Sequence, residues 1–268
     1  MKEKFVNNLK EGENFEDIFV IFDVKDEVIL GDKSGKIPAL FKEKEELKRG
    51  DFVKIRGRVF KENNKLKIEV EEFKKVTEKE IDIKDFIKVT EKSIDGMWEE
   101  FRKIAGEVKN PYLRELLSRI FKDKEIVDKF KKSPGASKMH HQWMGGLLEH
   151  TLNVCRACLK IAELYPKLDK DLLLTGAILH DIGKIKTYDL LPEIKINEEE
   201  LMISHIVAGY EIVKEKIKEI KDFPDDLAQK LLHLILSHHG ERKWGSPVEP
   251  RLPEAKVLHY LDILDAHI

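Results

Sequence analysis

The chain has 268 residues, and 49 basic against 51 acidic side chains leave a formal net charge of only −2 although 37% of the residues are charged. The 41% of hydrophobic residues suffices for a core, which excludes a disordered chain with few apolar residues and a large net charge. The near-neutral balance also excludes capture of nucleic acid by bulk positive charge.

Residues 14–73 alternate between short apolar, β-branched segments and turns, which predicts a small sheet. We expect five strands, with a helical segment at 42–48 before the fourth strand. This arrangement is typical of a small Greek-key barrel of the OB type. The expected strands are 15–23, 27–30, 36–41, 51–60 and 66–70.

The fourth expected strand alternates in chemistry between its two faces. One face is apolar, whereas the other carries cations between aromatic rings. A platform for single-stranded nucleic acid needs this combination, because cations bind phosphates and rings stack on bases. A solvated strand face is the alternative interpretation. The candidate nucleic-acid-binding residues are Phe52, Lys54, Arg56, Arg58 and Phe60.

From Ser93 onward the apolar period is helical, and the charged segment 74–92 before it is expected to be a linker. We therefore predict a multidomain chain of α and β type. An OB-type barrel spans 1–75, a linker and helical lead-in spans 76–135, and an all-helical domain spans 136–268. Its expected helices are 145–165, 170–182, 201–220, 226–239 and 254–267.

Membrane and secretory signals are missing from the sequence. The apolar runs are too short for a membrane span, and the N-terminus has no apolar signal segment, so no membrane partner is expected. The two cysteines, Cys155 and Cys158, exclude a disulfide framework and indicate a reducing, cytoplasmic setting. Their C-x-x-C spacing has no second pair, so packing within a helix is favoured over zinc binding.

All ten histidines lie in the helical half, and several fall on apolar faces. His238 continues the spacing of Leu227, Leu231 and Leu234, so it points where a core leucine would. Any one histidine is better explained as a hydrogen-bonded core or surface residue. Five helices that each supply a ligand-type residue are a different matter, because buried imidazoles and carboxylates are costly unless they bind something. A divalent metal such as Mn, Fe, Co, Ni or Zn suits both ligand types.

The histidines and aspartates follow the order His150, His180-Asp181, His205, His238, Asp262. This order resembles the HD-domain metal-dependent phosphohydrolases, whose signature is His…His-Asp…Asp. Three segments are similar to the YhaM-type 3′→5′ exoribonucleases, a family that places an OB-fold before an HD domain. These segments are HHQWMGGLLEHT at 140–151, HDIGK at 180–184 and LHYLDILDA at 258–266.

The resemblance implies two divalent metal ions, with Mn as the first choice and Co, Fe, Ni or Zn as alternatives. Asp181 would bridge the two ions and so take part directly in catalysis. The implied ligands of the first ion are His150, His180, Asp181 and Asp262, and those of the second are Asp181, His205 and His238, with His239 as a further candidate.

Four more residues are candidates for the substrate side of the site. Lys184, one helical turn beyond His180, would bring a cation to developing phosphate charge, and satisfying helix carbonyls is its alternative role. His140, His141 and Asp265 are expected to line a substrate pocket, although a structural role fits His140 and His141 equally well.

The expected function is therefore that of a metal-dependent 3′→5′ exonuclease. It would act on single-stranded RNA, with single-stranded DNA as an alternative, and release nucleoside 5′-monophosphates through a metal-activated water. An HD phosphohydrolase acting on nucleotides or cyclic dinucleotides, with a barrel that binds a protein, is the second hypothesis. A non-catalytic RNA-binding protein fits less well, because structural metal sites close with four ligands. A homo-oligomer is compatible with the sequence.

Overall fold

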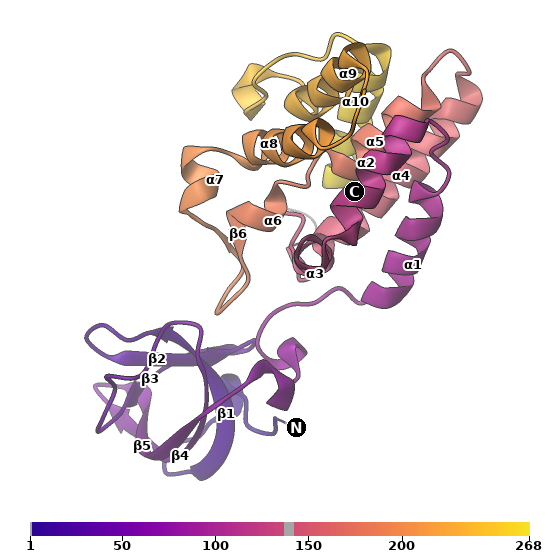
Figure 1. Ribbon diagram of the computed structural model, residues 1–268. Coiled ribbons are helices and arrows are strands. Elements are labelled where there is room, and N and C mark those ends of the chain that lie inside the picture. Colours follow the sequence, from indigo (N-terminus) through magenta and orange to yellow (C-terminus); the bar gives the residue numbers. More distant parts are fainter. Residues whose placement is uncertain (1, 137–141) are drawn as a thin grey trace. The chain divides into compact units, whose positions relative to one another are not determined.

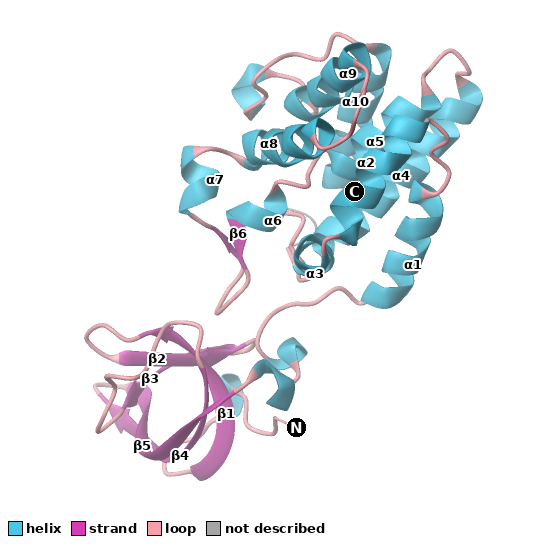
Figure 2. Ribbon diagram, viewed as in Figure 1, coloured by secondary structure: helices cyan, strands magenta, loops and turns pink. Residues whose placement is uncertain are grey.

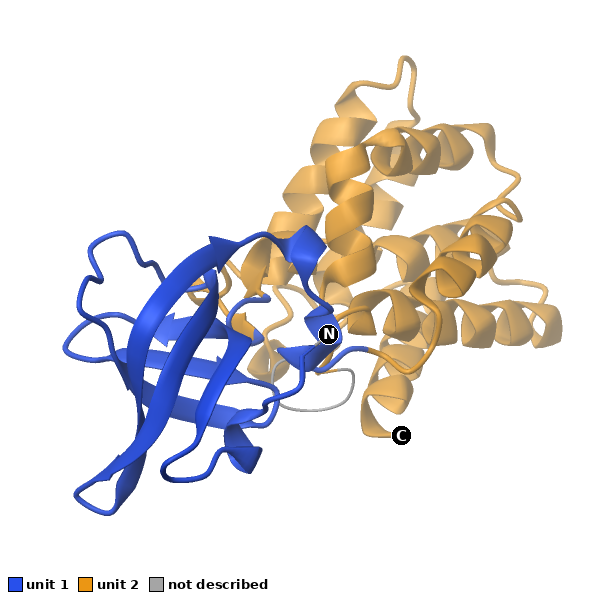
Figure 3. Cartoon of the chain, turned by 90° about the horizontal axis from the view of Figure 1, so that it is seen from below, with its two compact units in different colours: residues 1–89, 190–194 blue, residues 90–189, 195–268 orange. Residues whose placement is uncertain are grey.

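The structure is a computed structural model that describes residues 2–136 and 142–268 (Figure 1). It contains a β-rich part followed by a helical part (Figure 2). The chain divides into two compact units, residues 1–89 with 190–194 and residues 90–189 with 195–268 (Figure 3). In the described part of the chain, no helix has the length and apolar character needed to cross a membrane.

The units divide at other residues than the predicted boundaries, 75 and 135. Residues beyond 75 stay with the first unit because Phe86 is buried and packs against its strands. Residues 94–132 are more than a lead-in, since they form three helices whose apolar side chains lie in the same core as the later helices.

Five strands form one sheet in the first unit, closed into a barrel in the order β1-β2-β3-β5-β4. All neighbours are antiparallel except β3 and β5, which pair in parallel. Val53, Ile55 and Val59 of β4 point into the barrel core, as the alternation predicts. The strands are β1 (Asn14–Asp23), β2 (Val28–Asp32), β3 (Gly35–Leu40), β4 (Phe52–Glu62) and β5 (Lys65–Val76).

The helix expected at 42–48 is wrong, because this segment forms an irregular turn. Its charged residues provide no apolar stripe, and only Leu47 is buried in the barrel core. The Leu47 N–H donates to the Lys44 carbonyl at 3.0 Å and the Lys48 N–H to the Asp51 carboxylate at 2.9 Å. One apolar anchor and local hydrogen bonds therefore hold the turn without a helix.

The second unit is helical apart from a two-stranded hairpin, β6 (Tyr188–Asp189) with β7 (Lys195–Ile196). Asn110 caps α2, and Pro111 occupies its first position, as predicted for a helix start. The helices are α1 (Ile94–Ala105), α2 (Pro111–Lys122), α3 (Lys124–Lys132), α4 (Gly146–Leu164), α5 (Lys170–Leu179), α6 (Lys184–Thr187), α7 (Glu198–Met202), α8 (His205–Lys218), α9 (Asp225–Ser237) and α10 (Pro253–His267).

Helix α5 lies in the middle of the helical core, and every side chain from Leu172 to Leu179 is buried. Gly176 allows α9 to approach, because a Cβ at this position would lie 2.4 Å from a methyl carbon of Leu234. A helix that is apolar all round must be covered on all sides. The residues that follow α5, His180 and Asp181, are therefore buried inside the unit as well.

The single helix expected at 201–220 is wrong, because α7 ends at Met202 and α8 begins at His205. Ser204 between them has a φ of 72°, and its hydroxyl accepts a hydrogen bond from the Ile206 N–H at 3.3 Å. Serine favours this capping position because its side chain satisfies a free N–H of the new helix. The break places His205 at the first position of α8 with its ring buried.

Candidate metal centre

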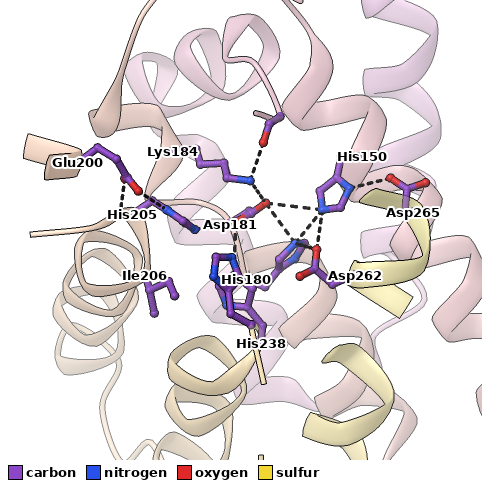
Figure 4. A network of polar contacts seen from close by, with 12 residues as sticks. His150, His180, Asp181, Lys184, Glu200, His205, Ile206, His238, Asp262 and Asp265 are labelled. Carbon is purple, nitrogen blue, oxygen red and sulfur yellow. Dashed lines mark hydrogen bonds and ion pairs between the residues drawn. The ribbon is translucent and has the colours of Figure 1, made fainter. Parts of the chain in front are cut away.

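Two groups of ligand-type side chains, all buried except the half-buried His239, meet around Asp181 (Figure 4). Within each group the ligand atoms all lie within 4.8 Å of one another. The residues come from helix ends and helix faces that pack together, as in bundles that bind metals in their core. The first group is His150 on α4, His180 and Asp181 after α5, and Asp262 on α10; the second is His205 on α8 with His238 and His239 after α9.

The Asp181 carboxylate faces both groups, one oxygen to each. Its Oδ2 lies 3.3 Å from His180 Nε2 and 3.6 Å from His150 Nε2. Its Oδ1 lies 3.4 Å from His205 Nε2 and 3.5 Å from His238 Nε2. A single carboxylate thus connects two sets of inward-facing imidazole nitrogens.

The five imidazoles of the two groups are held in one orientation by outer partners. In each ring Nδ1 lies 2.7–2.9 Å from a carboxylate or a backbone carbonyl oxygen. These oxygens only accept, so Nδ1 carries a proton and Nε2 is the ring nitrogen that points inward. The pairs are His150 with Asp265, His180 with Ala177, His205 with Glu200, His238 with Ile235, and His239 with Trp244.

Buried acceptor atoms in the second group have no hydrogen-bond partner. Asp181 Oδ1, His205 Nε2 and His238 Nε2 are all buried, and none of them makes a hydrogen bond with a described residue. Native proteins rarely bury such atoms unpaired, and three acceptors that face one another cannot satisfy each other. A divalent cation coordinated by imidazole and carboxylate would satisfy all three, so the residues fit a metal ion.

The first group is arranged around a positive charge. His150 Nε2 lies 3.1 Å from both His180 Nε2 and Asp262 Oδ1. Burial by itself lowers the pKa of His180, but Asp181 and Asp262 outweigh it and raise this pKa to about 10. Despite burial, neighbouring cationic groups hold the pKa of Asp181 and of Asp262 well below the usual range. The two carboxylates thus stay ionised, and the raised pKa of His180 keeps a positive charge between them.

The second group stays neutral at physiological pH. Burial lowers the pKa of His205 and of His238, and it lowers that of His239 to about 4, helped by the neighbouring His238. Neutral imidazole is the form that coordinates a metal ion. Protons should therefore compete with a metal ion for these three imidazoles only at a pH below the usual pKa of histidine.

Lys184 is a buried cation inside the site. Its Nζ donates to Asp181 Oδ2 at 2.5 Å and to the Gly135 carbonyl at 2.6 Å. Although burial lowers the pKa of Lys184, the adjacent Asp181 more than compensates and raises it. The structure therefore places the candidate cation against the shared carboxylate.

The three residues expected to line a substrate pocket have different outcomes. Asp265 lies behind His150 and pairs with its Nδ1 at 2.7 Å, so it orients a ligand-type residue rather than facing substrate. His140 and His141 lie outside the described residues.

Glu200 is a site residue that the sequence did not reveal. Its carboxylate accepts hydrogen bonds from the backbone N–H of His205 at 2.7 Å and from its Nδ1 at 2.8 Å. In a continuous helix, residues five apart do not share a face, so helical spacing pointed away from this pair. The break at Ser204 brings the two side chains together.

The candidate nucleic-acid face of β4 is shorter than predicted. Phe52 is wrong as a stacking residue, because it is 4% exposed and packs edge-on against Phe86 with ring centroids 4.9 Å apart. Lys54 is exposed and pairs with Glu16. Phe60 is half-buried.

The two arginines of this face differ in their ion pairs. Arg56 pairs with Glu72 at 2.6 Å and with Glu71 at 3.5 Å. Arg58 is exposed, and no ion pair links it to any residue that the structure describes. Arg58 is therefore the side chain of this face whose charge is available to a phosphate.

Comparison with known proteins finds two kinds of similarity. Residues 147–267, which lie in the helical unit, match the family model described as HD domain. The similarity to a solved structure, the HD domain of the L. monocytogenes phosphodiesterase PgpH, is weak at 18% identity and a TM-score of 0.32, over 59% of this chain and 73% of that one.

The chain is also homologous to proteins named 3′-5′ exoribonuclease YhaM. It is 37% identical over 172 residues to the protein of Bacillus velezensis, 39% over 166 residues to that of Bacillus licheniformis and 34% over 175 residues to that of Listeria welshimeri. These matches cover 63%, 60% and 64% of this chain, and 53%, 51% and 54% of the relatives. The chain thus spans about half the length of the curated relatives it matches.

Proposed function

We propose that this chain is a metal-dependent 3′→5′ exonuclease that hydrolyses single-stranded RNA to nucleoside 5′-monophosphates. The observation that carries the proposal is the Asp181 carboxylate, whose two oxygens face two separate sets of ligand atoms. The names of the homologous proteins support the reaction and its direction.

Two divalent ions fit these residues, and Mn is the first choice. His150, His180, Asp181 and Asp262 would hold one ion, and Asp181, His205, His238 and His239 would hold the other. When bound, such a pair of ions lowers the pKa of a water molecule and neutralises the oxygens of the phosphoryl group.

The protein residues prepare the site for this chemistry. The outer partners fix each imidazole with its Nε2 inward, so the ring orientation that a metal needs is already set. Lys184 keeps the Asp181 carboxylate ionised and adds positive charge next to the point where a phosphodiester would gain negative charge. Burial of every ligand-type side chain except His239 excludes water that would weaken these interactions.

We further propose that the five-stranded barrel is an OB-fold that holds the RNA strand. The closed sheet with order β1-β2-β3-β5-β4 supports this assignment. The face that would bind RNA includes Lys54, Arg56, Arg58 and Phe60, whereas the buried Phe52 contributes to packing. Since Lys54 and Arg56 are already paired with acidic residues, binding by the barrel should be weak and sensitive to salt.

End-labelled RNA tests the proposed reaction. A 5′-labelled single-stranded RNA incubated with the chain and Mn²⁺ should shorten stepwise, and a 3′-labelled one should release labelled mononucleotide at once. Asp181→Ala should abolish both, whereas Asp189→Ala, which removes an exposed carboxylate of the same unit, should not. Intact RNA together with cleaved nucleotides or cyclic dinucleotides would instead support the phosphohydrolase hypothesis. Full activity of Asp181→Ala would refute the metal site.

A further inference from the structure

A cavity of about 590 Å³ opens between α1, α2 and α3 of the helical unit. It shares no residue with the two groups of metal ligands. Its volume lies in the range of sites that hold small molecules. Aromatic and cationic side chains dominate its lining, namely Trp98, Phe101, Arg102, Phe121, Lys122 and Lys124.

Three aromatic rings form one wall of this cavity. Trp98 and Phe101 are stacked, with centroids 5.0 Å apart and planes inclined by 15°. Phe121 packs edge-on against both, at 5.8 Å from Trp98 and 5.0 Å from Phe101. Phe101 is buried, but Trp98 and Phe121 are only half-buried. The wall therefore leaves aromatic surface for a flat ligand.

The aromatic wall also offers a free hydrogen-bond donor. The indole N–H of Trp98 donates to no acceptor among the residues that the structure describes. Tryptophan in a protein interior usually finds a partner for this group, and because Trp98 lines the cavity, a bound ligand is a candidate acceptor.

Four cations line the cavity, and of these Lys131 pairs with Asp95 at 2.6 Å. Arg102, Lys122 and Lys124 are exposed, and none of them forms an ion pair with a described residue. The carboxylate in the lining, Asp128, is already bound by Lys132 at 2.9 Å. Because the charges of the whole chain almost balance, three unpaired cations beside aromatic rings favour the binding of an anionic ligand.

We infer that this cavity binds a nucleotide, with the base against Trp98 and Phe121 and the phosphate on Arg102, Lys122 and Lys124. An apolar ligand would leave the cations unpaired, and an inorganic anion would leave the aromatic wall uncovered. Stacking on aromatic rings combined with cations for phosphates is how proteins hold single-stranded nucleic acid. The nucleotide is either a free mononucleotide or one residue of an RNA strand, and only the RNA source rests on the proposed function.

Binding to the full chain in EDTA tests this inference without turnover. The probes are AMP, ribose 5-phosphate and a short single-stranded oligo(A) RNA, each titrated by calorimetry or fluorescence. AMP should bind at least about 10-fold more tightly than ribose 5-phosphate, which lacks the base. Phe121→Leu keeps an apolar side chain but removes a ring, so it should weaken the binding of AMP and leave the binding of ribose 5-phosphate unchanged. Thermal unfolding checks that this variant is folded.

A matched pair of double variants tests the cations. Lys122→Gln with Lys124→Gln removes two charges from the cavity, and Lys218→Gln with Lys256→Gln removes two exposed, unpaired charges elsewhere on the unit. Only the cavity variant should weaken AMP. For RNA, the slope of log affinity against log salt should become shallower by about 1.4, since each phosphate contact contributes about 0.7.

The two probes identify the source of the nucleotide. A loss confined to AMP supports a free mononucleotide, and a loss that includes RNA supports a residue of the strand. Equal binding of both probes by the cavity variant and the control variant would overturn the inference. Stepwise RNA shortening in Mn²⁺ is measured separately, so a chain that shortens RNA but binds no nucleotide here refutes only the cavity site. A chain that binds AMP here but never shortens RNA refutes only the proposed function.

Discussion

Asparagine in place of Asp181 removes the carboxylate that both groups of ligand atoms share. The two oxygens of Asp181 lie 3.3–3.6 Å from four imidazole Nε2 atoms, two in each group. Asparagine has the same shape, but it carries no charge and only one of its two polar atoms can accept. We therefore expect Asp181→Asn to weaken both metal ions together, whereas a variant of any other ligand should weaken one.

Asp265→Asn provides the matched control for this change. It removes the same charge from the outer side of the His150 ring, where Asp265 Oδ2 lies 2.7 Å from Nδ1. Loss of such an outer partner typically costs about 10–100-fold in metal affinity. We expect this loss for one ion in Asp265→Asn, and a loss of more than about 100-fold for both ions in Asp181→Asn.

Manganese titration by calorimetry, followed by metal analysis after desalting, measures the affinity and the number of bound ions. The wild-type chain should bind two ions, and Asp265→Asn should bind two with one weakened. Because Asp181→Asn leaves the buried Lys184 without its carboxylate, it should also lower the stability of the metal-free protein by about 3–5 kcal/mol, so the titration belongs well below its unfolding temperature. Two ions bound by Asp181→Asn at wild-type affinity would refute the shared-ligand geometry.

Three further predictions concern pH, packing and RNA binding. The folded state raises the pKa of His180 from its ordinary 6.5 to about 10, so protonated His180 stabilises the fold fully below pH 6.5 and this stabilisation is lost as the pH rises through 10. Unfolding temperatures measured in EDTA should therefore fall between pH 7 and 10. Mn²⁺ should remove this pH dependence because it displaces the proton. Gly183→Ala should destabilise the protein by about 1–3 kcal/mol and weaken the binding of one metal ion, because the new Cβ would lie 1.9 Å from the His205 carbonyl oxygen. As a control, Gly96→Ala on an open face of α1 should be neutral or stabilising in the same unfolding and titration assays. Arg58→Gln should make the salt dependence of RNA binding shallower by about 0.7 without changing the rate on a dinucleotide, and an unchanged slope would remove Arg58 from the RNA face.

The sequence predicted the residues that gather around Asp181 because helical spacing and ligand chemistry are both local properties. His238 in line with core leucines marks a buried position whatever the tertiary fold, and few ligands other than metals suit a buried imidazole beside a carboxylate. The same reasoning did not predict Glu200, because its contact with His205 depends on the positive φ of Ser204. One residue in an uncommon backbone conformation changed which side chains are neighbours.

The faces of β4 show a different limit. Alternation correctly separated Val53, Ile55 and Val59 from the residues on the other side. It could not show that Phe86, more than thirty residues later, would cover Phe52, because burial on the outer face depends on a distant segment of the chain. The same limit applies to the cavity between α1, α2 and α3, whose rings come from α1 and α2.

Although the whole chain is nearly neutral, it contains local groups of charge, and RNA binding and catalysis depend on different groups. Without divalent ions, the two buried carboxylates of the metal centre are balanced by Lys184 and by the raised pKa of His180, so the centre offers little attraction to a phosphodiester. Arg58 on the barrel, and Arg102 with Lys122 at the cavity, carry unpaired positive charge whether or not metal is present. RNA should therefore bind in EDTA with strong salt dependence and remain uncut, and cleavage should begin when Mn²⁺ is added. If EDTA abolished binding as well, the metal centre itself would be the main RNA contact, and the roles assigned to the barrel and the cavity would be wrong.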